Sequence, residues 1–188
     1  MCEKNLRRKT TVKVVLTAML IALYFVLDRL LVFYPTESIK ISFNFVPIAV
    51  AAVFLGPVYS MLTAGLGDLL GALLMPVGVP NPILTASAFL SGLIFGLFVY
   101  SKSECKLSKK IVLVIVANLV VSVVFNLLVN TFALAFMYSR ETLWQYFFAT
   151  LAPRLFKEVI IFVIRVGFFL ALMLPNGKFS EYLKRTLN

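Results

Sequence analysis

The length of the apolar runs constrains this chain more than any other feature. No charged residue occurs between Ile111 and Phe136. A helix of that length exceeds the hydrocarbon core of a bilayer, which is about 30 Å thick and takes roughly 20 apolar residues to cross. Over the whole chain 61% of residues are hydrophobic and only 14% are charged, whereas soluble domains carry about 25% charged residues. The sequence therefore predicts an integral membrane protein.

Charged residues, prolines and glycines divide the chain into six apolar segments. We predict that each segment is a membrane-spanning helix, so the expected fold class is an all-α bundle of six transmembrane helices. The bundle would form a single domain over residues 1–188, with spans at residues 12–33, 42–55, 58–75, 83–100, 111–136 and 146–174.

The distribution of Lys and Arg predicts the orientation of these spans. Twelve of these residues lie in the amino-terminal segment, the connection between the fourth and fifth spans, and the carboxy-terminal tail, which six spans place on one side. The opposite loops contribute only Lys40 and Arg140. Because cytoplasmic loops carry the excess of positive charge, we expect a multi-pass protein of the cell membrane with both termini in the cytoplasm. The basic clusters are short and lack interleaved aromatics, so no nucleic-acid partner is expected.

Two absences narrow the possible functions. The sequence contains no histidine, which removes the Ser-His-Asp triad and the HExxH metal site. It also lacks the GxxxxGK(S/T) loop that holds nucleotide phosphates. We therefore expect neither an enzyme nor a bound metal or cofactor.

Charged side chains inside the predicted spans indicate a polar interior, because such charges are costly in hydrocarbon and usually face a cavity or the bundle interior. Apart from Lys13 at the basic amino-terminal end, seven residues belong to this set: Asp28, Arg29, Asp68, Arg154, Lys157, Glu158 and Arg165. Asp28 and Arg29 lie near the outer end of the first span. Snorkelling to the interface explains these two as well as a functional role does.

The last predicted span carries three of its charges on one face. At 100° per residue, Glu158 and Arg165 lie about 40° and 20° from Arg154, and Lys157 flanks this stripe. One interpretation is an Arg154–Glu158 ion pair at i, i+4 that only joins helices. The other is a binding site, in which the excess positive charge meets Asp68, an anionic ligand, or both.

Two further patterns support a polar site. Asp68 in the third span has small neighbours at a spacing that suits close helix packing: Gly65, Gly67 and Gly71. The fifth span repeats polar residues at every fourth position: Asn118, Ser122, Asn126 and Asn130. The repeat indicates either interhelical contacts or the wall of a polar cavity. Taken together, the patterns predict a cavity in the outer half of the bundle.

Several short motifs follow one another between Lys40 and Phe98. They are an extended KISF, a proline within the second span, GP at the inner turn, DLLG on the third span, a Pro-x-Gly, and a Thr-x-Ser-Ala that opens the fourth span. As a set they resemble the membrane-embedded S components of energy-coupling factor (ECF) vitamin transporters, and among these the folate-specific branch. Ala18 and Ala22 match the Ala-xxx-Ala motif through which S components contact a transmembrane scaffold subunit.

The resemblance implies a high-affinity vitamin binder without its own energy source. The implied partners are folate or a related vitamin, the ECF transmembrane scaffold subunit, two ATPase subunits and the lipid bilayer. Ala18 and Ala22 become the expected docking residues. The expected substrate-binding residues are Asp68, Arg154, Lys157, Glu158, Arg165, Arg29, Lys40 and Asn126.

Three alternatives stay open on the sequence. The first is an S component for another vitamin, such as pantothenate or a queuosine precursor. The second is a structural scaffold that resembles the small rod-shape-determining membrane proteins and binds no vitamin. The third is a membrane enzyme that uses Asp68 and Glu158 as an acid–base pair.

Overall fold

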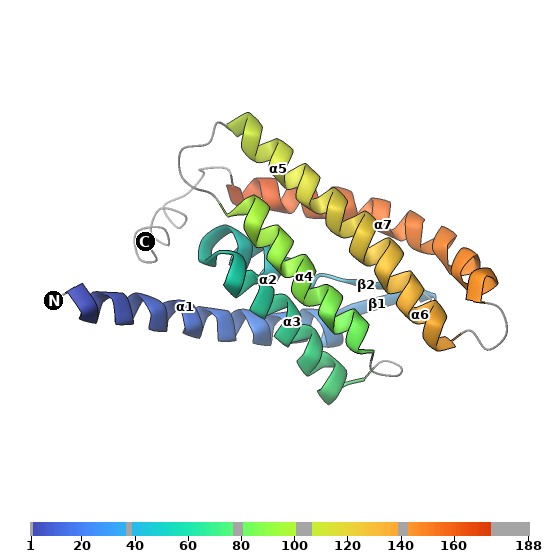
Figure 1. Cartoon of the computed structure of the whole chain (residues 1–188), viewed down its shortest axis with the longest axis horizontal. Helices are drawn as coiled ribbons and strands as arrows, with labels where there is room; N and C mark the ends of the chain where they lie inside the picture. The colour runs from blue at the N-terminus through green and yellow to red at the C-terminus, as the bar shows by residue number, and fades with distance from the viewer. Residues whose placement is uncertain (1, 37–38, 77–80, 101–106, 139–142, 174–188) are drawn as a thin grey trace.

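The computed structural model of the chain describes residues 2–36, 39–76, 81–100, 107–138 and 143–173. Within these ranges the backbone is almost entirely helical, with one short β-hairpin (Figure 1). Several basic residues on which the predicted orientation depends lie outside the described ranges: Lys102, Lys106, Arg140, Lys178, Lys184 and Arg185. The placement of both termini in the cytoplasm therefore stays a prediction.

The described residues form six helical stretches, three of which contain π-helical segments, labelled η. The first three stretches are α1 (Cys2–Phe25) with η1 (Val26–Leu30), α2 (Phe45–Val50) with η2 (Ala51–Leu55), and α3 (Pro57–Leu74). The last three are α4 (Pro82–Val99), the continuous helix α5 (Leu107–Val120), η3 (Val121–Val129) and α6 (Asn130–Tyr138), and α7 (Leu143–Met173). Strands β1 (Val32–Thr36) and β2 (Ile39–Ser42) separate η1 from α2.

Most of these helices have the length and composition of membrane spans. Four stretches in the described part of the chain are long and apolar enough to cross a bilayer: Thr10–Leu30, Pro57–Leu74, Pro82–Val99 and Ser108–Met137. The stretch Phe45–Leu55 is apolar but shorter, and α7 has 31 residues but includes four charged ones. The apolar helices agree with the predicted membrane protein, while the number of spans stays a prediction.

The β-hairpin differs from the sequence prediction, which extended the first span to residue 33 and began the second at residue 42. The first helix ends at Leu30 and α2 begins at Phe45, so the connection is longer than expected. The two strands pair antiparallel, with Val32 opposite Ser42. Their β-branched and aromatic residues favour strands, and Pro35 lacks the N–H that a continuing helix needs.

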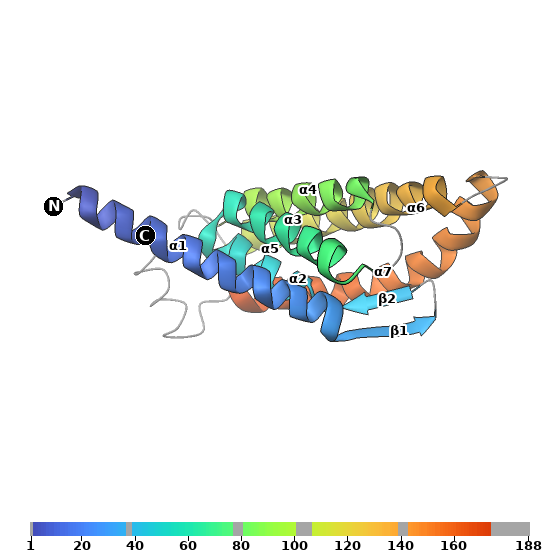
Figure 2. The same cartoon turned by 90° about the horizontal axis from the view of Figure 1, so that it is seen from below.

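Most helices pack on neighbours that are close in the chain. Helix α1 packs on α3, α3 on α4, α4 on α5, and both α5 and α6 on α7 (Figures 1 and 2). Small residues bring α3 and α4 together, because a Cβ at Gly92 would lie 2.6 Å from the carbonyl oxygen of Ser60. In the core, the ring of Phe95 stacks on that of Phe169 at 4.9 Å between centroids.

Two local features fix the ends of the central helices. Gly56 has φ of 103°, a left-handed conformation that glycine adopts without the cost of a Cβ, and it turns the chain between η2 and α3. Asn81 caps α4, since its Oδ1 accepts a hydrogen bond from the backbone N–H of Ile83 at 2.9 Å. Its Nδ2 also donates to the carbonyl of Ala133 at 3.2 Å. Asn81 thus holds the start of α4 against α6.

Candidate functional site

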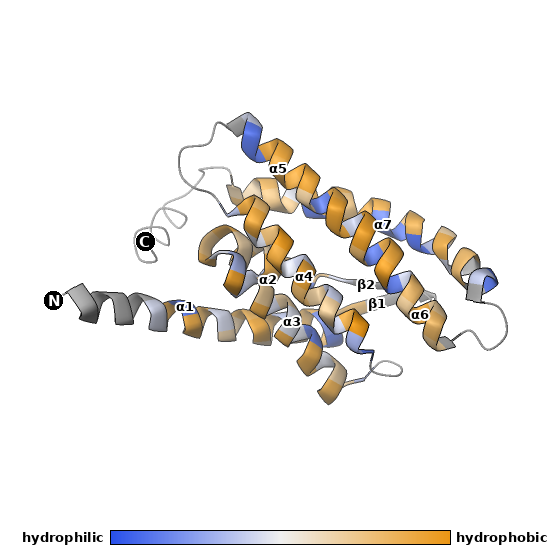
Figure 3. Cartoon of the chain, viewed as in Figure 1, coloured by the Kyte–Doolittle hydropathy of each residue, from blue (hydrophilic) through white to orange (hydrophobic). Residues whose placement is uncertain are grey.

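A cavity of about 370 Å³ lies among the helices and receives side chains from every helical stretch described above. Seven charged residues of the predicted spans line it: Asp28, Arg29, Asp68, Arg154, Lys157, Glu158 and Arg165. Short hydrophilic segments stand out within otherwise apolar helices (Figure 3). Since charges are buried only where partners or a ligand meet them, this cavity is the candidate binding site.

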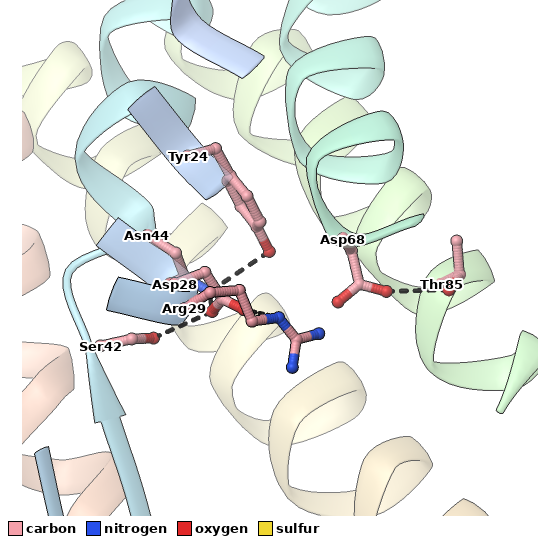
Figure 4. Close-up of polar contacts among 7 residues, drawn as sticks. All are labelled: Tyr24, Asp28, Arg29, Ser42, Asn44, Asp68 and Thr85. Atoms are coloured by element: carbon pink, nitrogen blue, oxygen red, sulfur yellow. Dashed lines mark hydrogen bonds and ion pairs between the residues drawn. The ribbon is translucent and has the colours of Figure 1, made fainter. Parts of the chain in front are cut away.

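Asp28 is the centre of a first group of polar residues, here called the hairpin cluster: Tyr24, Asp28, Arg29, Ser42 and Asn44. The Oδ1 atom of Asp28 accepts hydrogen bonds from Asn44 Nδ2 at 2.8 Å and from Ser42 Oγ at 3.2 Å. Asn44 Nδ2 also donates to the hydroxyl oxygen of Tyr24 at 3.2 Å. The cluster therefore joins the end of the first helix to β2 and the start of α2 (Figure 4).

Arg29 enters the cavity beside Asp28. Its Nε lies 3.3 Å from Asp28 Oδ2, close enough for an ion pair, but the N–H is not aligned for a hydrogen bond. The side chain is only 9% exposed. Because both residues are buried rather than at the interface, snorkelling does not explain them.

Asp68 lies across the cavity from Arg29 and contacts α4 (Figure 4). Its Oδ2 accepts a hydrogen bond from Thr85 Oγ1 at 2.8 Å. Thr85 is the threonine of the Thr-x-Ser-Ala motif, so two of the quoted motifs meet in space.

A second group of polar residues surrounds the Glu158 carboxylate on α7. This α7 cluster consists of Ser122, Asn126, Glu158 and Arg165. Glu158 Oε1 accepts from Arg165 Nη2 at 3.1 Å and from Asn126 Nδ2 at 2.9 Å. Arg165 Nη1 in turn donates to Ser122 Oγ at 3.3 Å. The ion pair between Arg165 and Glu158 therefore joins residues two helical turns apart. Arg154 instead donates to Thr131 Oγ1 on α6 at 3.4 Å.

The π-helical segment η3 reduces the drift of the polar repeat of the fifth span around the helix axis. In an α-helix, a step of four residues rotates about 40° beyond a full turn. In the wider π-helix, with about 4.4 residues per turn, the same step rotates by less than a full turn. The two drifts oppose each other along α5 and η3. As a result Ser122 and Asn126 both contact α7, and Asn130 accepts from Ser87 on α4 at 2.7 Å.

The structure brings most of the predicted binding residues together. Seven of the eight line the cavity: Asp68, Arg154, Lys157, Glu158, Arg165, Arg29 and Asn126. Lys40 lies in β2, and its side chain falls outside what the structure describes. Ala18 and Ala22, the expected docking residues, are exposed on α1, whereas Thr17 next to them is buried. Their roles stay predictions.

Sequence reasoning selected Asn126, which donates to Glu158, but it did not select Asp28 or the neutral residues that contact Asp28 and Asp68. Ser42 and Thr85 do lie in the quoted KISF and Thr-x-Ser-Ala motifs, whereas Asn44 is a single polar residue with no distinctive spacing. Asp28 did carry a signal, because it is a charge within a predicted span. Its exposure of 2% shows that the signal pointed to the cavity.

The cavity can bind a ligand that has both hydrogen-bond donors and anionic groups. Carboxylates accept from ring N–H and amino groups, while guanidinium and ammonium groups bind carboxylates. Among the described residues, no group of three or more His, Cys, Asp or Glu side chains could hold a metal ion.

Comparisons with known proteins give the family of the chain. Residues 12–174 match the family model described as the substrate-specific component of ECF transporters. A protein named Folate transporter FolT from Leuconostoc mesenteroides is 35% identical over 153 residues, which cover 81% of this chain and 80% of that protein. A Clostridium novyi protein of the same name is 35% identical over 69% of each chain.

Solved structures show the same relationship. A crystal structure of FolT bound with folic acid covers 93% of each chain, with a TM-score of 0.69 and 32% sequence identity. A solved S component of a bacterial ECF transporter covers 94% of this chain and 99% of that one, with a TM-score of 0.65 and 25% identity. The resemblance carried by the short motifs is thus confirmed, and the chain belongs to the substrate-specific S components of ECF transporters.

Proposed function

We propose that this chain captures folate outside the cell and delivers it through an energising module shared with other S components. The family is a transport component rather than an enzyme, which sets aside the acid–base enzyme and the structural scaffold. The observation that carries the folate assignment is the charged cavity, in a chain 32% identical over 93% of its length to a protein solved with folic acid.

The chemistry of the cavity suits the two ends of folate. The edge of the pterin ring offers N–H donors, for which Asp68 is the proposed acceptor. The glutamate tail carries two carboxylates, for which Arg154 and Lys157 are the proposed partners. A volume of about 370 Å³ lies within the range of small-molecule sites.

The proposed arrangement in the membrane has six spans and both termini in the cytoplasm. Six helical stretches in the described residues support this number. The exposed apolar side chains on α1, α3, α4, α5 and α7 support contact with lipid, because no water-soluble protein of this size would expose so many. The distribution of Lys and Arg supports the orientation.

The proposed partners are a transmembrane scaffold subunit and two ATPase subunits. The chain has no phosphate-binding loop of its own, so ATP hydrolysis must occur elsewhere. Ala18 and Ala22 are the proposed docking residues on α1, because their small exposed side chains let another helix approach closely.

Calorimetric titration of the detergent-purified chain with folate tests the assignment. We expect nanomolar affinity, on the order of −12 kcal/mol. Pantothenate and a queuosine precursor serve as controls and should give neither heat nor a thermal shift. A response to one of these vitamins, with none to folate, would replace folate by that vitamin.

A further inference from the structure

Two glycines of α3 provide room for two cavity side chains of the first helix. A Cβ atom at Gly67 would lie 2.6 Å from Cγ of the Tyr24 ring. A Cβ atom at Gly71 would lie 2.5 Å from Arg29 Nε, 2.9 Å from Nη2 and 3.1 Å from Cζ. Since Gly67 and Gly71 are four residues apart, they lie on the same face of α3. That face holds Tyr24 and Arg29 in place.

Arg29 lies close to both Asp28 and α3. Asp28 Oδ2 lies 3.3 Å from its Nε, and a Cβ at Gly71 of α3 would lie within 3.1 Å of three atoms of its guanidinium. The group points from η1 towards the helix that carries Asp68 (Figure 4). Among the described residues, none accepts a hydrogen bond from the terminal Nη groups of Arg29. These donors can therefore bind a ligand.

We propose that Gly71 is a positioning residue, which sets where Arg29 presents its guanidinium to the bound ligand. The proposal rests on folate binding as the function. A methyl group at position 71 would overlap three atoms of one planar group, so the whole guanidinium would have to move. Those atoms are the end of a flexible side chain, so the helices themselves can stay in place. The expected result is a folded protein with a misplaced Arg29.

Other glycines provide matched controls. A Cβ at Gly167 would meet nothing within 4 Å, so Gly167→Ala controls for the substitution itself. A Cβ at Gly65 would overlap the ring of Phe89, which is not among the residues that line the cavity. Gly65→Ala therefore controls for tighter helix packing away from Arg29.

The test measures folate affinity in a double-mutant cycle. We expect Gly71→Ala to weaken binding about tenfold or more, as for loss of one charge-assisted contact, and Gly167→Ala to leave binding unchanged. In the Arg29→Ala background, Gly71→Ala should weaken binding by less than about threefold, because alanine ends at Cβ and lacks the atoms that overlap. Equal losses in both backgrounds would overturn the proposal, as would unchanged affinity in Gly71→Ala alone.

A measurement without ligand separates this proposal from the proposed function. The Arg29 Nε–H signal in a ¹⁵N NMR spectrum is identified by its disappearance in Arg29→Lys. We expect this signal to shift in Gly71→Ala and to stay in place in Gly65→Ala. If wild type fails to bind folate but the signal shifts as expected, only the ligand assignment fails. An unmoved signal would exclude Gly71 as the residue that positions Arg29.

Discussion

The two charged clusters of the cavity are held together in opposite ways. In the hairpin cluster, the carboxylate of Asp28 accepts two neutral hydrogen bonds besides its contact with Arg29. In the α7 cluster, Arg165 donates to Glu158 and to Ser122, and Glu158 accepts from Asn126. The first cluster thus has a carboxylate that keeps its partners without the arginine. In the second, each charge keeps a single neutral partner when the other charge is removed.

The largest expected effect comes from removing each arginine in turn. Arg165→Met leaves Glu158 buried with a single neutral donor, and breaking such a pair typically costs about 3–5 kcal/mol. Arg29→Met should cost less, about 1 kcal/mol, because Ser42 and Asn44 still donate to Asp28. Unfolding of the two variants in detergent measures the difference.

A double variant serves as the control for this prediction. Glu158→Gln together with Arg165→Met removes both charges, so it should recover much of the stability lost in Arg165→Met. Equal losses from Arg29→Met and Arg165→Met would show that the two clusters are not held together differently.

A smaller effect is expected from Asp68, which faces the hairpin cluster across the cavity. Asp68→Asn keeps the shape of the side chain but removes its charge, and a hydrogen bond to a charged group is worth about 1.5–3 kcal/mol. We therefore expect a loss of folate affinity of roughly 10- to 100-fold, larger than for Lys40→Ala. Normal binding with lower thermal stability would instead make Asp68 a structural partner of Thr85.

Arg154 provides the matching test at the other end of the ligand. If it binds the glutamate tail, Arg154→Met should weaken folate more than a pterin without that tail. Equal losses for both ligands would place Arg154 away from the tail.

The smallest effect on binding is expected from changes outside both clusters. Ala18→Trp with Ala22→Trp adds bulk to two exposed positions of α1, so folate affinity of the solitary protein should stay nearly unchanged. Copurification with the scaffold subunit and uptake by cells should be lost. If affinity falls as well, the residues pack within the chain, where overpacking costs roughly 1–3 kcal/mol. If neither changes, the partner docks elsewhere.

The sequence predicted the helices well because apolar length is a local property. It did not predict the hairpin, since VFYPT continues an apolar run without a break and the end of the helix is set by Pro35 and the strand partner. The π-helical segments were also missed. A membrane helix is apolar on most faces, so its hydrophobic pattern carries little information on the helical period.

The charged residues of the cavity could be predicted because hydrocarbon makes every buried charge informative. Which of these charges pair with each other could not be predicted. The ion pair between Glu158 and Arg165 depends on Asn126 and Ser122, which come from another helix. Neutral polar residues such as Thr85 are common in membrane helices, so only the fold shows which of them contacts a carboxylate.

The segment η3 also has a consequence for comparing relatives. A π-helical segment contains an extra residue relative to an α-helix of the same number of turns. A relative that keeps the same two helix ends but is α-helical throughout would therefore align with this chain only through a one-residue gap within Val121–Val129. A gap at that place would record an evolutionary change in the path of the helix, with the residues on either side still equivalent.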